Sequence, residues 1–219
     1  MAIQIVGPGG FTAEVDQTYD ALRVTTRPPQ GDGAYFSAQL SGALAGAAAA
    51  SVVWAFRWPH ASKLAVFDLM RIRAVPTTPF TAAQVWGFDA VVGRTFTATH
   101  TGGTAVTPSA TTWKKRTLYP TSNVGEIRMA TTAAFTGGTV TPDTNAFLMD
   151  YAWELVAGVT VARSKIAIEK DYGSSNDSPI VLAQNEGILV RPTHALGAGG
   201  VIALNVEVAW REVDATLFG

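Results

Sequence analysis

The clearest hydrophobic pattern in the chain lies near its end, in residues 202–210. Large apolar side chains at the even positions, from Ile202 to Trp210, alternate with Ala, Asn, Glu and Ala at the odd positions. A period of two places the large side chains on one face of a β-strand. At about 3.3 Å per residue, this strand would be roughly 30 Å long, which is about the width of a small domain. We therefore expect a long strand in the middle of a sheet, buried on one side.

Two further stretches show the same alternation, residues 52–58 and 84–96. In the first, Trp54, Phe56 and Trp58 share one face. Such a stripe could be a sugar-binding platform, but aromatic rings flanked by aliphatic side chains more often pack in a core. In the second stretch both faces are largely apolar, so this strand should be covered on both sides.

The rest of the chain predicts short strands separated by turns. Extended segments are expected at residues 22–26, 34–40, 63–75, 145–153, 159–170, 180–182 and 188–190, and prolines at positions 76 and 79 should end the third of these. Residues 43–50 are rich in alanine, which favours helix, but the run is short and contains Gly46, which costs about 1 kcal/mol relative to alanine. We therefore predict an all-β protein, a single β-sandwich domain over residues 1–219 with long Thr/Gly-rich loops.

Two of these loops are nearly repeated, at residues 101–108 and 136–142. Two copies are too few for a solenoid, so we interpret them as two similar loops. The basic cluster at residues 113–116 is more typical of a solvated turn, or of a contact with an acidic neighbour, than of a nucleic-acid site. Residues 171–177 offer oxygen atoms that could bind calcium, but their spacing is not that of an EF-hand, and a surface turn is expected.

The N-terminal residues 1–10 are a possible arm. Ala2, Ile3, Gln4, Ile5 and Val6 alternate as a strand does, before glycine and proline stop the run at residues 7–10. This segment could add to a neighbour's sheet, so these five residues are the candidate interaction residues. The segment lacks the pattern of a signal peptide, and no run of about twenty apolar residues occurs, so we expect a soluble protein with no membrane contact.

Composition narrows the function classes. The net charge is -1, and charged residues make up 15% of the chain against a typical share of roughly 25%, so no nucleic-acid partner is expected. With 47% hydrophobic residues, either neighbouring subunits cover part of the surface or the core is large. The absence of cysteine excludes disulfides, thiolate metal sites and a cysteine nucleophile.

No stretch carries recognisable catalytic chemistry. His60, His100 and His194 each stand alone, without a second ligand at metal-binding spacing, and there is no G-x-S-x-G elbow. We expect no catalytic, metal or cofactor site and no enzyme. One alternative stays open, a pair of carboxylates for glycoside hydrolysis. Its candidates are Asp68, Asp89, Asp150 and Glu154.

Several segments resemble structural proteins of tailed-bacteriophage particles. They are residues 179–191, which read PIVLAQNEGILVR, together with 80–84, 101–104, 196–200 and 206–210. The resemblance implies a jelly-roll-like sandwich without an active site, located in the virion as a capsid decoration protein. It also implies a homo-oligomer, most simply a trimer, whose partner is the major capsid protein or another virion protein. A tail-associated or carbohydrate-binding module is the alternative.

Overall fold

The computed structural model describes residues 5–6, 12–16, 21–23, 34–109, 113–114, 120–149, 153–155, 157–158, 166–171, 179–197 and 199–217. The chain divides into two compact units, Met1–Gly31 and Asp32–Gly219. In the first unit, β1 (Ile5–Val6), β2 (Thr12–Asp16) and β3 (Ala21–Arg23) form an antiparallel sheet in that order. The expectation of a single domain over residues 1–219, with residues 1–10 as an arm, stays a prediction.

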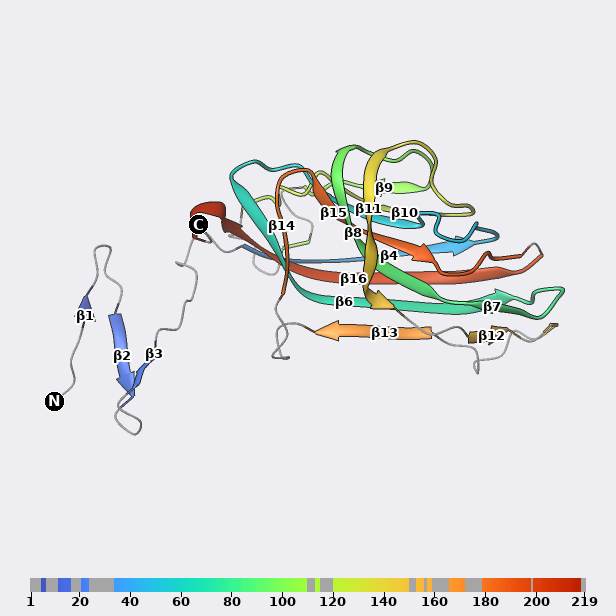
Figure 1. The fold of residues 1–219 in the computed structure, drawn as a ribbon, viewed down its shortest axis with the longest axis horizontal. Coiled ribbons are helices and arrows are strands. Elements are labelled where there is room, and N and C mark those ends of the chain that lie inside the picture. The colour runs from blue at the N-terminus through green and yellow to red at the C-terminus, as the bar shows by residue number, and fades with distance from the viewer. Residues whose placement is uncertain are drawn as a thin grey trace. The chain divides into compact units, whose positions relative to one another are not determined.

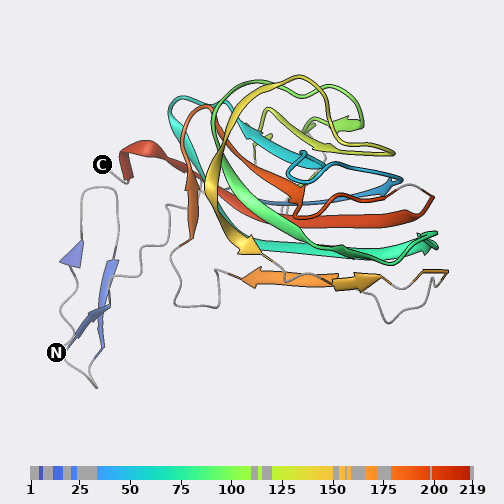
Figure 2. The same ribbon diagram turned by 45° about the vertical axis from the view of Figure 1, so that its right-hand side comes forward.

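The second unit is a sandwich of two antiparallel sheets, stacked face to face in Figures 1 and 2. The first, which we call the β16 sheet, contains β4 (Ala34–Leu44), β6 (Lys63–Thr78), β13 (Ile166–Asp171), β14 (Ile180–Leu182) and β16 (Val201–Asp214). The second, the β5 sheet, contains β5 (Trp54–Trp58), β8 (Phe88–Ala98), β9 (Thr104–Val106), β10 (Glu126–Met129), β11 (Thr139–Met149) and β15 (Glu186–Pro192). A separate pair is formed by β7 (Gln84–Trp86) and β12 (Trp153–Leu155), and a 3-10 turn follows β16 at Ala215–Leu217.

The order of the strands is that of a jelly roll. One sheet runs β13-β6-β16-β4, and the other runs β11-β8-β15-β5 before β10 and β9 extend its edge. The last strand, β16, therefore lies between β4 and β6, while β15 lies between β5 and β8 (Figure 1). This interleaving of early and late strands across two sheets is the jelly-roll arrangement. The prediction of an all-β, jelly-roll-like sandwich is confirmed.

The core lies between the two sheets. The even positions of β16 from Ile202 to Trp210 are at most 1% exposed, as the alternation predicts, and Trp54, Phe56 and Trp58 of β5 are fully buried. The ring of Phe56 packs edge-on against Trp210, with centroids 5.2 Å apart. The aromatic stripe of residues 52–58 is thus core, and the sugar-platform interpretation of that stripe is wrong.

A second, smaller apolar cluster lies on the other side of the β5 sheet. Ala55, Val91, Leu189 and Phe96 are buried there, and Phe135 packs against them. Burial on both faces, predicted for residues 84–96, is therefore confirmed for residues 88–91 but not for the whole stretch, because Gly87 divides it into β7 and β8 and Val85 and Arg94 are exposed.

The helix propensity of residues 43–50 is not realised, and one local expectation is wrong. Residues 43–50 contain no helix, because β4 extends to Leu44 and the chain then makes isolated bridges from Gly46 and Ala47 to Ala133 and Leu196. Prolines do not end the strand of residues 63–75 either, because β6 runs on to Thr78. Pro76 lies at a shift in the register between β6 and β16. It also lies beyond Ala74, which is the last residue of β6 that pairs with β13. Irregular strand ends of this kind tolerate proline.

The two Thr-Gly loops lie against each other. The Thr101 N–H donates to the Thr136 carbonyl at 2.8 Å, and the Thr136 N–H donates back at 3.2 Å. Both glycines of each loop have a positive φ, between 60° and 84°, which glycine adopts without steric cost. Their interpretation as two similar loops is confirmed for the glycine turns at residues 101–103 and 136–138, whereas the second part of each copy is extended, in β9 and at the start of β11.

The first prediction tests the two faces of β16. Val206 is fully buried, whereas Glu207 on the opposite face makes only a partly exposed ion pair with Arg71. Val206→Asp should prevent folding, because an unpaired buried carboxylate costs several kcal/mol. Glu207→Ala should cost less than about 1 kcal/mol. Thermal unfolding followed by circular dichroism compares the two variants, and equal midpoints would show that the buried face is assigned wrongly.

Candidate functional site

The structure describes only part of the predicted interaction segment. Ala2, Ile3 and Gln4 lie outside the described residues, while Ile5 and Val6 form β1. This strand pairs with β2 within the first unit, Ile5 opposite Ala13. The strand expected from the alternation is present at these two residues, and its role in binding a partner stays a prediction.

The candidate carboxylates do not gather in one place. Asp68 belongs to β6 and accepts three hydrogen bonds from Arg211, at 2.8 to 3.1 Å, whereas Asp89 belongs to β8 in the other sheet and accepts two from Arg191. Asp150 lies outside the described residues, and Glu154 is placed only as a member of β12. Asp68 and Asp89 therefore do not form a catalytic pair.

The histidines and the basic cluster also stand apart from one another. Among the residues that the structure describes, no three His, Asp or Glu side chains lie close enough to hold a metal ion. In the basic cluster, Lys114 bridges Phe36 of β4, and Lys115 and Arg116 fall outside the described ranges. No helix in the described part of the chain has the length and apolarity needed to cross a membrane.

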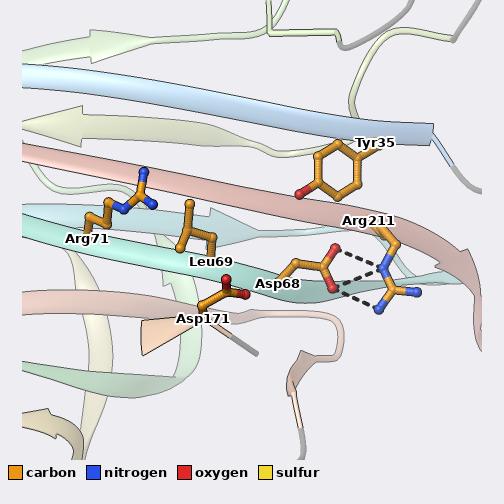
Figure 3. Close-up of a pocket in the computed structure, with 6 residues that line it drawn as sticks. All are labelled: Tyr35, Asp68, Leu69, Arg71, Asp171 and Arg211. Atoms are coloured by element: carbon orange, nitrogen blue, oxygen red, sulfur yellow. Dashed lines mark hydrogen bonds and ion pairs between the residues drawn. The ribbon is translucent and has the colours of Figure 1, made fainter. Parts of the chain in front are cut away.

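A pocket of about 450 Å³ opens on the outer face of the β16 sheet. Its lining comes from four neighbouring strands (Figure 3). The lining residues are Tyr35, Asp68, Leu69, Arg71, Asp171 and Arg211. The sheet register places Tyr35 opposite Arg211 and Asp171 opposite Leu69, so the pocket is a product of strand pairing rather than of a loop.

A β-bulge shapes the middle of this pocket. Ala209 of β16 pairs with Leu69, and the next residue, Trp210, pairs with Phe67, so Asp68 is the extra residue of β6. A bulge breaks the alternation of the strand and turns a side chain in a new direction. Here it brings the Asp68 carboxylate against the Arg211 guanidinium at the pocket wall (Figure 3).

Arg71 forms the opposite end of the pocket (Figure 3). It donates to Glu169 of β13 at 2.8 Å and to Glu207 of β16 at 3.3 Å. These hydrogen bonds raise the pKa of Arg71, and the bond from Arg71 lowers the pKa of Glu169. The Nε atom of Arg71 is buried and makes no hydrogen bond, so one donor of this side chain is unused.

Tyr35 completes the wall on the β4 side. Burial raises the pKa of its phenol, and the negative charge of Asp68 raises it further. The hydroxyl is therefore protonated at neutral pH and able to donate a hydrogen bond.

Sequence reasoning missed this pocket. The alternation in residues 202–210 places the odd positions outside, and Arg71 and Arg73 stand two apart on one strand face, so a polar outer face was readable. The pocket itself depends on the bulge at Asp68. This bulge arises from the way β6 pairs with β16, and no local sequence pattern indicates it.

A second buried carboxylate, Glu212, holds the segment before β10. Glu212 is 1% exposed and accepts hydrogen bonds from the Ser122 hydroxyl, from the backbone and side-chain nitrogens of Asn123, and from the Trp210 indole. The carboxylate of Glu212 is therefore hydrogen-bonded by neutral donors rather than paired with an arginine. The arrangement fixes residues 122–124 against β16, which is a structural task.

Glu212→Ala should lower the free energy of unfolding by about 3 kcal/mol, because it leaves several donors without an acceptor in a closed space. Glu169→Ala, which removes an exposed carboxylate of the same sheet, is the control and should cost less than about 1 kcal/mol. Urea unfolding of both variants measures the difference. Similar losses would mean that the Glu212 contacts do not stabilise the fold.

His100 lies beneath the paired Thr-Gly loops. Its ring packs against Phe96 and Phe135, and a Cβ on Gly138 would come within 2.8 Å of it. Burial lowers the pKa of His100 below its ordinary value of 6.5. The folded protein therefore keeps this imidazole neutral at a pH where the unfolded chain already binds a proton.

Stability should consequently fall as the pH drops below 6.5, because the unfolded state then binds more protons than the folded state. His100→Phe, which keeps an aromatic ring between the two phenylalanines, should reduce this loss between about pH 7 and about pH 5. The exposed His194, changed to Gln, is the control and should leave the wild-type slope. Thermal midpoints measured across this pH range test the prediction. An equal dependence of the midpoint on pH in the wild type and in both variants would contradict it.

In comparisons with known proteins, no family model matches this sequence, and no curated protein matches it.

Proposed function

We propose that this protein is a non-enzymatic structural component of a tailed-bacteriophage virion, where it decorates and stabilises the capsid. It would act by binding copies of itself, as a trimer, and the surface of the major capsid protein or another virion protein. The observation that carries the proposal is the jelly-roll sandwich, an architecture that recurs in viral capsid proteins. One fold can serve many functions, so the fold alone does not identify the function. Three further observations support the proposed role.

The first concerns the segments that resemble virion proteins. Residues 179–191 form β14 and most of β15, and residues 206–210 lie in β16. β15 and β16 are inner strands of the two sheets, each hydrogen-bonded on both sides. The resemblance therefore includes two inner strands of the sandwich, while residues 80–84, 101–104 and 196–200 lie mostly in the turns and loops between strands.

The second is the division of the chain. Residues Met1–Gly31 form a compact unit of their own, apart from the sandwich unit. Within it β1 lies at the edge of the sheet β1-β2-β3 and pairs with β2 alone among the described strands. An unpaired strand edge is able to add to the sheet of a neighbouring subunit.

The third is the character of the surface. Among the described residues, Val85 and Val181 are the large hydrophobic side chains that are exposed. A contact through the described surface would therefore use main-chain groups and small polar side chains. This fits an N-terminal strand as the main contact better than a broad apolar patch.

The experiment removes residues 1–10. Deletion should weaken self-association and binding to capsids that lack this protein, because it removes β1. The thermal midpoint of the sandwich should change little, because Asp32–Gly219 forms a unit with its own core. Light scattering gives the oligomer mass, and co-sedimentation with capsids gives the binding.

Point variants sharpen this test. Ile5→Lys should weaken assembly, whereas Gln4→Lys, which places the same charge on the other face of the predicted strand, should be tolerated. A full-length protein that stays monomeric at high concentration and does not bind capsids would refute the proposal.

A further inference from the structure

The pocket on the outer face of the β16 sheet has no part in the virion role argued above. We propose that this pocket binds a neutral saccharide. The inference is independent of the proposed function, because it rests on the sandwich unit and not on residues 1–10.

Size and construction are the first argument. A volume of about 450 Å³ lies within the roughly 300–1,000 Å³ of typical ligand pockets. The lining side chains stand on β4, β6, β13 and β16, in positions fixed by sheet register and by the bulge at Asp68. A site built on paired strands is ordered before the ligand arrives, which lowers the entropic cost of binding.

Charge is the second argument. Two carboxylates, Asp68 and Asp171, and two guanidinium groups, Arg71 and Arg211, line the pocket, and Arg71 also contacts the carboxylates of Glu169 and Glu207. A phosphate would lie close to the two carboxylates, and an ammonium group close to the two arginines. Charged groups of both signs therefore lie at the pocket, and this favours a ligand without net charge over an anion or a cation.

Hydrogen-bonding capacity is the third argument. The carboxylates accept, the arginines donate, and the Tyr35 phenol does both, all around one space (Figure 3). Arg211 uses Nε and Nη2 on Asp68, so Nη1 is the nitrogen of this guanidinium that is not bonded to that carboxylate. A sugar hydroxyl both donates and accepts, so a ring with several hydroxyls can satisfy such a mixed set.

The remaining surface suits the apolar side of a sugar ring. The aliphatic side chain of Leu69 is part of the lining, and the Tyr35 ring lies on the β4 side of the pocket (Figure 3). A pyranose carries hydroxyls at its edge and C–H groups on its face, and an aromatic or aliphatic side chain packs against such a face. Polar groups around an apolar patch are thus the combination that a saccharide needs.

The test is a titration of the full-length protein, labelled with nitrogen-15, with glucose, galactose, mannose and N-acetylglucosamine at up to tens of millimolar. Saturable shifts of the amide signals of Tyr35, Leu69 and Asp171 are expected with at least one of these sugars. Glucose 6-phosphate and glucosamine, one anionic and one cationic, should bind more weakly than the neutral sugars.

Two variants tie binding to the pocket. Tyr35→Phe and Asp171→Asn should each weaken binding about tenfold, because each removes one polar contact without changing the size of the side chain. Arg73→Ala, an exposed residue of β6 outside the pocket, is the matched control and should bind as the wild type does. Thermal midpoints confirm that all three variants fold.

Three results would overturn the inference: no saturable shift with any of the neutral sugars, wild-type affinity in both pocket variants, or tighter binding of a charged probe. The protein without residues 1–10 should bind the sugar unchanged. Loss of assembly in that protein and loss of sugar binding in the pocket variants are therefore separate outcomes.

Discussion

The whole sandwich depends on the burial of one face of β16. This strand pairs with β4 on one side and β6 on the other, and its even-numbered side chains meet the aromatic residues of β5 across the core. Because side chains alternate along a strand, placing Val206 and Trp210 in the core also fixes Glu207 and Arg211 on the outer face. One constraint therefore sets both the hydrophobic core and the polar surface above it.

The ion pairs on that outer face orient the charged side chains more than they stabilise the fold. Arg71 is held between Glu169 and Glu207, with side chains about a third to a half exposed, and such pairs contribute about 0–1 kcal/mol. Holding each guanidinium in one orientation nevertheless gives the pocket a defined set of donors. The bulge at Asp68 adds the acceptor that anchors Arg211, so an irregularity of the strand creates the asymmetry that a flat sheet face lacks.

The sequence alone predicts the elements whose hydrophobic patterns are regular. It does not predict local structure that depends on which strands pair with one another. The alternations of residues 52–58 and 202–210 predict two central strands and most of the core. Extending the second alternation to Glu212 places a carboxylate on the buried face, a signal that a polar partner had to exist. The alanines of residues 43–50 favour helix, but pairing, and not propensity, decides the local structure there. The pocket needed four strands in register, which no local pattern encodes.

A sandwich that commits both inner faces to its core leaves outer faces, strand edges and terminal segments for recognition. This chain uses these regions in different ways. Its N-terminal unit contains a short strand, β1, at the edge of the described sheet, and we propose that this strand makes main-chain contacts between subunits. Its β16 sheet offers side chains fixed by register, which suit a small polar ligand. Since the N-terminal strand and the pocket share no residues, the proposed assembly and the proposed ligand binding would be free to change independently of each other.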